Sequence, residues 1–183
     1  MKLTPTLFEG AFEVTPTPFT DERGYFAVAF EKKAFEEAGL ATEYIQTNIA
    51  HNIRKGTLRG LHSRIGPHQE AKLVQCVQGA IYDVIVDDRP DSPTYRQWIG
   101  MELSARNGKL LYIPEGFLHG YYTLTDDTTV QYQVTGEYTP HAEIGVRFDD
   151  PALNIEWPGE ITVISQKDCE WPLLPKPVKA PSF

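Results

Sequence analysis

The chain has 183 residues, enough for one domain with a substantial buried core. Its 17 basic and 25 acidic residues give a formal net charge of −8, which argues against nucleic-acid binding because such proteins carry a basic face. No apolar run approaches the roughly 18 residues of a membrane helix, and the N-terminal residues lack a signal-peptide stretch. With only Cys76 and Cys169, neither a disulfide framework nor a cysteine-based zinc site is expected, and a cytoplasmic protein is the default.

The predicted elements are mostly short strands. One helix is predicted over residues 31–38, where good helix formers precede Gly39. Alternation over residues 80–86 predicts a strand with Asp83 on one apolar face. Enrichment in Tyr, Ile, Val and Thr predicts the other strands, over residues 71–77, 97–103, 109–113, 120–124 and 128–135.

Many short strands that are separated by turns predict an all-β sandwich or barrel. Residues 1–183 are interpreted as a single domain, because no repeat or low-complexity tract divides them. The last residues, 172–183, contain four prolines and are expected to form an extended tail or a clasp, with the core ending near residue 170.

His62 is the first candidate for chemistry. Strand periodicity places Gly60 on the same face as His62 and turns Arg59 to the opposite face. A β-bulge at Gly60 would bring both Arg59 and His62 inward. The alternative is a histidine at a strand end that is bonded to a carbonyl group.

A second signal lies at Gly108, Pro114, Gly116 and His119, whose spacing matches the second motif of the cupin superfamily. The match is specific because four positions agree together. Pro114 and Gly116 are expected to form the tight turn between two strands. His119 then re-enters the barrel with its ring directed inward.

The first cupin motif is incomplete. Gly56 and His62 fit it, but Arg64 occupies the place of the second histidine ligand, and Glu70 follows after five intervening residues. Catalytic metal sites usually need three protein ligands, and a cation beside the metal would repel it. The pattern therefore predicts a cupin barrel without a metal, with His68 as a weak substitute ligand.

Taken together, several linked segments resemble the dTDP-4-dehydrorhamnose 3,5-epimerase family over roughly residues 8–175. Their shared order and spacing are specific, whereas each alone is weak. The segments are residues 19–26, 45–48, 58–62, 71–74, 83–87, 92–94, 113–120 and 165–168, with Tyr132, Thr135 and Tyr138.

This resemblance implies a cupin-type jelly-roll with one or two short helices, and a homodimer in which a strand crosses to the partner. It implies no metal or organic cofactor. The implied substrate is a nucleotide-diphosphate-linked 4-keto-6-deoxy-hexose, inverted at C3, C5 or both in deoxysugar biosynthesis. The mechanism it implies is proton transfer through an enolate.

The resemblance also implies roles for individual residues. His62 resembles the general base, Asp168 the carboxylate that orients it, Tyr132 the acid on the opposite face, and Lys72 the residue facing the keto oxygen. The implied substrate-binding residues are Arg23 and Arg59 at the diphosphate, Phe26, Gln46, Asn48 and Tyr138 around the nucleoside and sugar, the pair His119 and Asp83, and Lys167.

These residue types suit the reaction. A C4 ketone acidifies the hydrogens at C3 and C5, so inversion needs a base on one face of the ring and an acid on the other. Histidine is a good base near neutral pH, and a carboxylate fixes its tautomer. A lysine can stabilise the developing oxyanion, and arginine forks onto phosphate oxygens.

Each assignment has a structural alternative. Lys72 could be a solvated edge lysine, Tyr132 a core aromatic residue, and Asp168 a helix or turn cap. Arg23 could be a turn residue. Asp83 is harder to explain structurally, because a carboxylate within an apolar strand needs a partner.

Some positions depart from the usual family pattern: Val28, Ser63, Arg64, Glu70, Gln133 and Glu137. Arg64 and Glu70 have opposite charges and are candidates for an ion pair. Val28 and Glu137 leave the nucleotide open between dTDP, which is expected first, and CDP or GDP. Ser63, Arg64 and Glu70 leave open whether C3, C5 or both are inverted.

Three other functions compete with the double epimerase: a mono-epimerase, a 3,4-ketoisomerase of the cupin type, and a sugar-binding cupin without turnover. The ketoisomerases lack this arrangement of Tyr132. Binding alone would not require an acid and a base, so the set His62, Tyr132 and Asp168 favours an enzyme.

Overall fold

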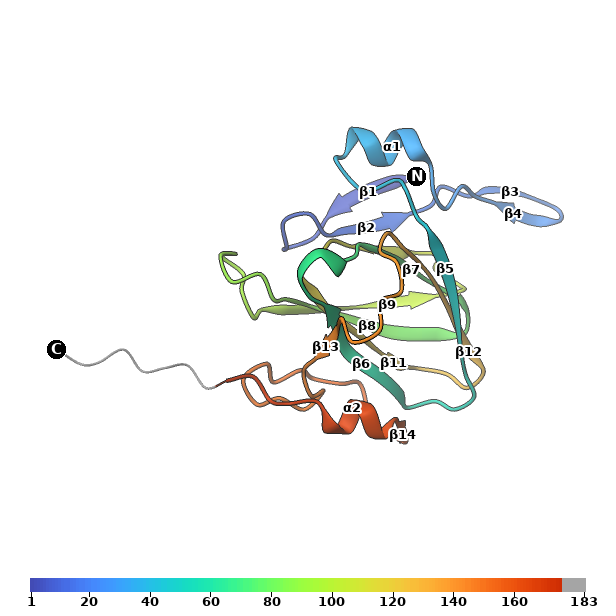
Figure 1. Ribbon diagram of the computed structural model, residues 1–183. Helices are drawn as coiled ribbons and strands as arrows, with labels where there is room; N and C mark the ends of the chain where they lie inside the picture. Colours follow the sequence, from blue (N-terminus) through green and yellow to red (C-terminus); the bar gives the residue numbers. More distant parts are fainter. Residues whose placement is uncertain (176–183) are drawn as a thin grey trace.

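The computed structural model describes residues 1–175, and the predictions for 176–183 lie outside the described residues. Two antiparallel sheets face each other as a jelly-roll sandwich (Figure 1). The first sheet contains, in spatial order, β1 (Lys2–Pro5), β2 (Phe12–Thr15), β10 (Leu110–Ile113), β7 (Lys72–Gln78), β12 (Thr128–Val134) and β5 (Gln46–Asn52).

The second sheet contains β13 (Glu143–Gly145), β6 (Thr57–Arg64), β11 (Phe117–Thr123), β8 (Ala80–Asp87) and β9 (Trp98–Ser104). The short strand β14 (Val163–Ile164) pairs in parallel with β6. The predicted all-β class is therefore confirmed. One prediction began too late: β11 starts at Phe117, not at residue 120, because the turn at Gly116, with a φ of +82°, is already complete.

The main core lies between the sheets. Ile81 and Ile85 of β8 pack there with Val74 and Leu111 of the first sheet, and all four side chains are buried. Tyr82, Val84 and Val86 point to the other face of β8 and pack in a separate cluster. The predicted alternation is confirmed, and it directs Asp83, which is fully buried, toward the interior of the sandwich.

Helices are few and short. The predicted helix is observed as α1 (Lys32–Glu37), which buries Phe35 against Tyr112 and Val14. It ends before Gly39, whose φ of +71° suits glycine. The other helices are the 3₁₀ turn η1 (Gly66–His68) and α2 (Gln166–Glu170), and none in residues 1–175 is long and apolar enough to cross a membrane.

Two peripheral segments differ in how they meet the body. The hairpin of β3 (Phe19–Asp21) and β4 (Gly24–Phe26) projects outward (Figure 1). Residues 172–175 instead lie against the body: the Leu174 amide donates a hydrogen bond to the Asp150 carboxylate, and Arg147 donates to the Pro172 carbonyl. The described part of the predicted tail is therefore packed against the body, and the choice between a tail and a clasp stays a prediction.

Candidate active site

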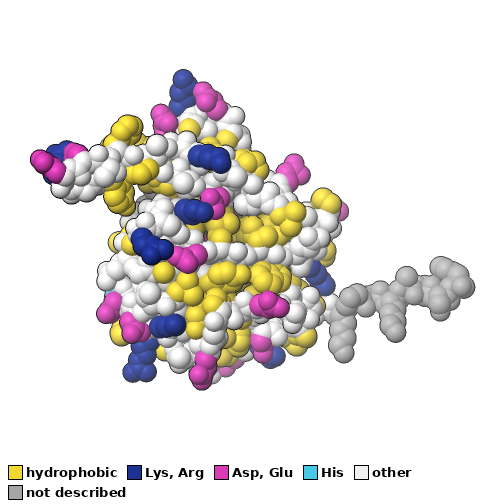
Figure 2. Space-filling view, turned by 180° about the vertical axis from the view of Figure 1, so that it is seen from behind, with side chains coloured by type: hydrophobic (Ala, Val, Ile, Leu, Met, Phe, Trp, Pro, Cys, Tyr) yellow, Lys and Arg dark blue, Asp and Glu magenta, His cyan; other side chains and the backbone are white. Residues whose placement is uncertain are grey.

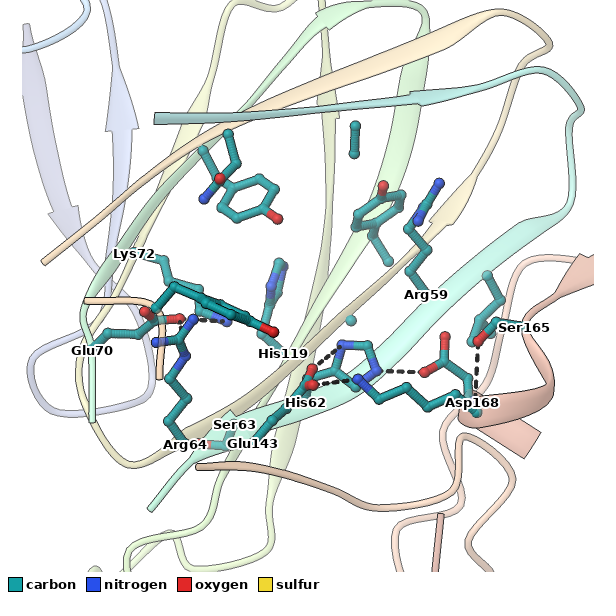
Figure 3. Close-up of a pocket in the computed structure, with 18 of the residues that line it drawn as sticks. Arg59, His62, Ser63, Arg64, Glu70, Lys72, His119, Glu143, Ser165 and Asp168 are labelled. Carbon is teal, nitrogen blue, oxygen red and sulfur yellow. Dashed lines mark hydrogen bonds and ion pairs between the residues drawn. The ribbon is translucent and has the colours of Figure 1, made fainter. Parts of the chain in front are cut away.

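A cavity of about 670 Å³ opens between the two sheets and is lined by residues from both (Figure 3). Its walls come from β5, β7 and β12 of the first sheet and from β6, β11, β13 and β14 of the second. Most of the predicted site residues line it: Gln46, Asn48, Arg59, His62, Lys72, His119, Tyr132, Tyr138, Lys167 and Asp168.

The predicted irregularity at Gly60 shapes one wall. His62 pairs with His119 and Arg59 pairs with Tyr121, so two residues of β6 face the single Gly120 of β11. This bulge lets both His62 and Arg59 line the cavity, as expected. A Cβ added at Gly60 would lie 2.5 Å from the Cα of Gly120, so the close approach requires glycine.

His62 is held by Asp168. Its Nε2 atom lies 2.5 Å from Oδ1 of Asp168, which stands in the first turn of α2. Burial opposes ionisation of Asp168, but hydrogen bonds from the His62 and Ser165 side chains outweigh it and hold the pKa of this carboxyl below its usual value. The helix cap is Ser165, whose Oγ accepts a hydrogen bond from the Asp168 amide, so Asp168 is not the cap of the structural alternative but the partner of the histidine.

The other ring nitrogen of His62 faces a second carboxylate. Oε1 of Glu143, on β13, lies 3.5 Å from Nδ1 of His62 (Figure 3). Glu143 is also ion-paired with Lys167. Both Glu143 and Lys167 line the cavity. Lys167, predicted as a substrate-binding residue, is therefore engaged by a protein carboxylate in this structure.

Tyr132 approaches from the opposite wall. It lies on β12, in the first sheet, whereas His62 lies on β6, in the second. Its strand neighbours are Asn48 and Val74. Burial, reinforced by the negative charge of Glu70, raises the pKa of Tyr132, so the phenol keeps its proton at neutral pH.

Lys72 belongs to a buried ion-pair cluster. Oε1 of Glu70 lies 3.3 Å from Nε of Arg64 and 3.6 Å from Nζ of Lys72, so the expected Arg64–Glu70 pair is confirmed (Figure 3). Burial lowers the pKa of Lys72, and the Glu70 charge opposes this decrease. Lys72 is thus a cavity-lining lysine and not a solvated edge residue.

Arg64 connects this cluster to the segment that follows β12. Its Nη1 atom donates a hydrogen bond of 2.6 Å to the Glu137 carbonyl oxygen, and its guanidinium carbon lies 5.7 Å from the centre of the Tyr138 ring. Arg64 therefore holds Tyr138 at the cavity, although the phenol ring itself is largely exposed.

Two further pairs orient polar groups in the interior. Nε2 of His119 lies 2.7 Å from Oδ1 of Asp83, which gives this buried carboxylate the partner that it needs. Asp83 itself supports the cavity from behind His119 and does not line it. Nε of Arg59 donates a hydrogen bond of 2.8 Å to the Asn52 side chain.

Arg23 and Phe26 are not brought to the cavity by this chain. Both belong to the projecting hairpin, where Arg23 pairs with Asp21 and the Phe26 side chain is 68% exposed. Figure 2 shows the hairpin standing away from the body, with charged side chains at its tip and hydrophobic ones nearer its base. Their predicted roles stay predictions.

Glu143 was not predicted from the sequence, and Arg64 and Glu70 were predicted as an ion pair but not as site residues. Glu143 lies on a three-residue strand that pairs with Arg64 of β6. A strand this short carries no readable alternation, so no local signal identified it. His68, the weak metal-ligand candidate, does not line the cavity, and no cluster able to hold a metal occurs in residues 1–175.

Comparison with known proteins gives consistent matches. A family model described as dTDP-4-dehydrorhamnose 3,5-epimerase matches residues 5–176. A Sinorhizobium fredii protein of that name is 43% identical over 162 residues, which cover 88% of this chain and 83% of the relative. A Streptomyces niveus relative named dTDP-4-dehydrorhamnose 3-epimerase is 38% identical over 169 residues, which cover 92% of this chain and 81% of the relative.

Among solved structures, the Bacillus anthracis dTDP-4-dehydrorhamnose 3,5-epimerase with TDP and pyrophosphate bound is similar. It superposes with a TM-score of 0.91 at 43% identity, covering 94% of this chain and 99% of the other. The similarity therefore extends over almost the whole fold.

Proposed function

The chain belongs to the dTDP-4-dehydrorhamnose 3,5-epimerase family, and we propose that it inverts C3 and C5 of a dTDP-linked 4-keto-6-deoxy-hexose in deoxysugar biosynthesis. One observation carries the proposal beyond the similarity. A histidine backed by a carboxylate and a protonated phenol line opposite sheets of one cavity, as inversion of a carbon requires.

The chain's own groups account for each proton. Nδ1 of His62 takes the hydrogen from C3 or C5, because Asp168 occupies Nε2 and fixes the tautomer. The electron pair of the broken C–H bond moves into the C4 carbonyl and forms an enolate. Tyr132 then returns a proton to the same carbon from the other face, which inverts it.

Cations stabilise the charges of substrate and intermediate. Lys72 faces the C4 oxygen and stabilises the enolate, an effect of about 3–4 kcal/mol for a well-placed donor. Arg59, held by Asn52, binds the diphosphate, with Gln46, Asn48 and Tyr138 around the nucleoside and sugar. His119, supported by Asp83, completes the wall near the sugar.

We further propose a homodimer in the cytoplasm, in which the β3–β4 hairpin carries Arg23 and Phe26 to the partner's cavity. Phe19, Tyr25 and Phe26 of the hairpin are each more than 60% exposed. Ile49, on the edge strand β5, is 71% exposed. Exposed apolar edges and arms of this kind usually mark an interface.

The reaction is tested by proton exchange in D₂O. The protein is incubated with dTDP-, CDP- and GDP-linked 4-keto-6-deoxy sugars, and C3 and C5 are followed by NMR. Exchange and inversion at both carbons of the dTDP sugar are expected. Exchange at a single carbon would identify a mono-epimerase, as the 3-epimerase relative is named, and exchange at neither carbon in any substrate would reject an epimerase.

The shared cavity is tested by mixing defective subunits. His62→Ala and Arg23→Ala are each expected to be nearly inactive alone. Co-expression forms hybrid dimers in which one cavity combines an intact His62 with an intact partner Arg23, so activity should reappear. Light scattering that returns the monomer mass of 20.7 kDa, or hybrids without activity, would reject this arrangement.

A further inference from the structure

His62 has two ring nitrogens, and protein carboxylates face both of them. Asp168 is hydrogen-bonded to Nε2, and its side chain is only 5% exposed. Glu143 lies 3.5 Å from Nδ1, the nitrogen left for the substrate, and its side chain is 38% exposed. Of these two carboxylates, only Glu143 has substantial access to water.

The position of Glu143 is fixed by its neighbours. It pairs in register with Arg64 of β6, two residues beyond His62, and Lys167 of α2 forms an ion pair with its other oxygen, Oε2. Oε1 is therefore left facing the imidazole (Figure 3). A carboxylate held at this place can accept a proton from Nδ1 after a rotation of the side chain or through one water molecule.

Turnover by the proposed function creates a need for such a group. Each inversion leaves His62 with one additional proton and Tyr132 with one fewer. Both must return to their starting states before the next carbon is inverted. Asp168 is a poor exit because it is buried, so a proton passed to it does not reach solvent.

We propose that Glu143 is the proton exit of His62, an inference that rests on the proposed function. The hydrogen abstracted from carbon moves from Nδ1 to the Glu143 carboxylate and then to water, while Tyr132 regains a proton from water. The sum is one proton released and one taken up for each inversion. Glu143 does not touch the reacting carbon; it acts through His62 by passing the proton of the imidazole on to water.

The test separates proton abstraction from recovery of the enzyme. The substrate carries deuterium at C3 and C5, and loss of the label into H₂O is followed by mass spectrometry after rapid quenching. With enzyme in excess, the first loss reports abstraction by His62. With substrate in excess, the steady-state rate also includes the reset of His62.

For Glu143→Gln, we expect the first loss of label to stay within about twofold of the parent protein, while the steady-state rate falls about tenfold. Added formate or imidazole should raise the steady-state rate of this variant in proportion to concentration, because a small buffer replaces the missing acceptor. Glu143→Asp, which keeps a carboxylate, should recover part of the rate without buffer.

Glu170→Gln is the matched control, because it makes the same substitution on an exposed residue of α2 that pairs with Gln166. It should behave as the parent in both regimes and show no response to buffer. Two results for Glu143→Gln would overturn the proposal. One is an equal decrease of the single-turnover and steady-state rates without a response to buffer, and the other is no decrease of either rate. A parent protein that releases no label would instead reject the proposed function, and this inference with it.

Discussion

Nε2 of His62 lies 2.5 Å from Oδ1 of Asp168, although 106 residues separate the two in the chain. The contact joins a strand of the second sheet to the short helix α2, which Ser165 caps. Because this hydrogen bond fixes the tautomer and the orientation of the ring, the action of His62 as a base depends on Asp168.

Replacing Asp168 therefore tests the pair. Asp168→Asn keeps the shape of the side chain but removes its charge, so we expect kcat/KM for C–H exchange to fall by about 10²-fold or more. His62→Ala should abolish exchange. Deuterium uptake measured by NMR gives the exchange rate of both variants. Full activity in either variant would contradict the assignment of the His62–Asp168 pair as the base.

Tyr132→Phe should separate exchange from inversion. His62 can still abstract a hydrogen and return one to the same face, so label exchange should persist. Inversion should fall by about 10²-fold or more, because no acid remains on the opposite wall. The inverted product is measured by NMR coupling constants, and Tyr95→Phe, which lies outside the cavity, is the control.

A pH profile tests the charge cluster around Lys72. Burial lowers the pKa of Lys72, and the positive charge of Arg64 lowers it further. The negative charges of Glu70 and Glu143 raise this pKa. Tyr132 keeps its proton at neutral pH and adds no charge. In the proposed mechanism the protonated lysine is the active form, and it is lost as pH rises through its pKa.

Replacing Glu70 and replacing Arg64 should shift the decline of kcat/KM at high pH in opposite directions. Glu70→Gln removes a charge that holds the proton on Lys72, so activity should decline at lower pH than in the parent. Arg64→Gln removes a charge that repels it, so activity should persist to higher pH. Shifts in the same direction would show that this decline does not report Lys72.

Gly60→Ala should destabilise the fold strongly. A methyl group would meet backbone of Gly120 and His119 at 2.5 and 2.7 Å, at a φ of +119°. We expect a loss of about 2–4 kcal/mol in the free energy of unfolding. Gly24→Ala is the matched control, because Gly24 has a similar φ of +124° but open space around it. We expect this variant to lose only about 1–2 kcal/mol in the free energy of unfolding. Urea unfolding measures both, and equal losses would contradict the close approach.

From the sequence alone, local patterns predicted the strands that became β7 to β12, a candidate bulge at Gly60 and the inward ring of His119. These features follow from local rules, because strand alternation and glycine conformation act over a few residues. The sequence also indicated that Asp83 needs a partner, since an isolated buried carboxylate is costly. His119 provides that partner.

Only the tertiary structure placed Glu143 beside His62, grouped Arg64 and Glu70 with Lys72, and put His62 and Tyr132 on opposite walls. These relations join distant parts of the chain, and they depend on which strands pair and which sheets face each other. A pattern within one strand specifies which side chains point inward, but not which other side chains they will meet there.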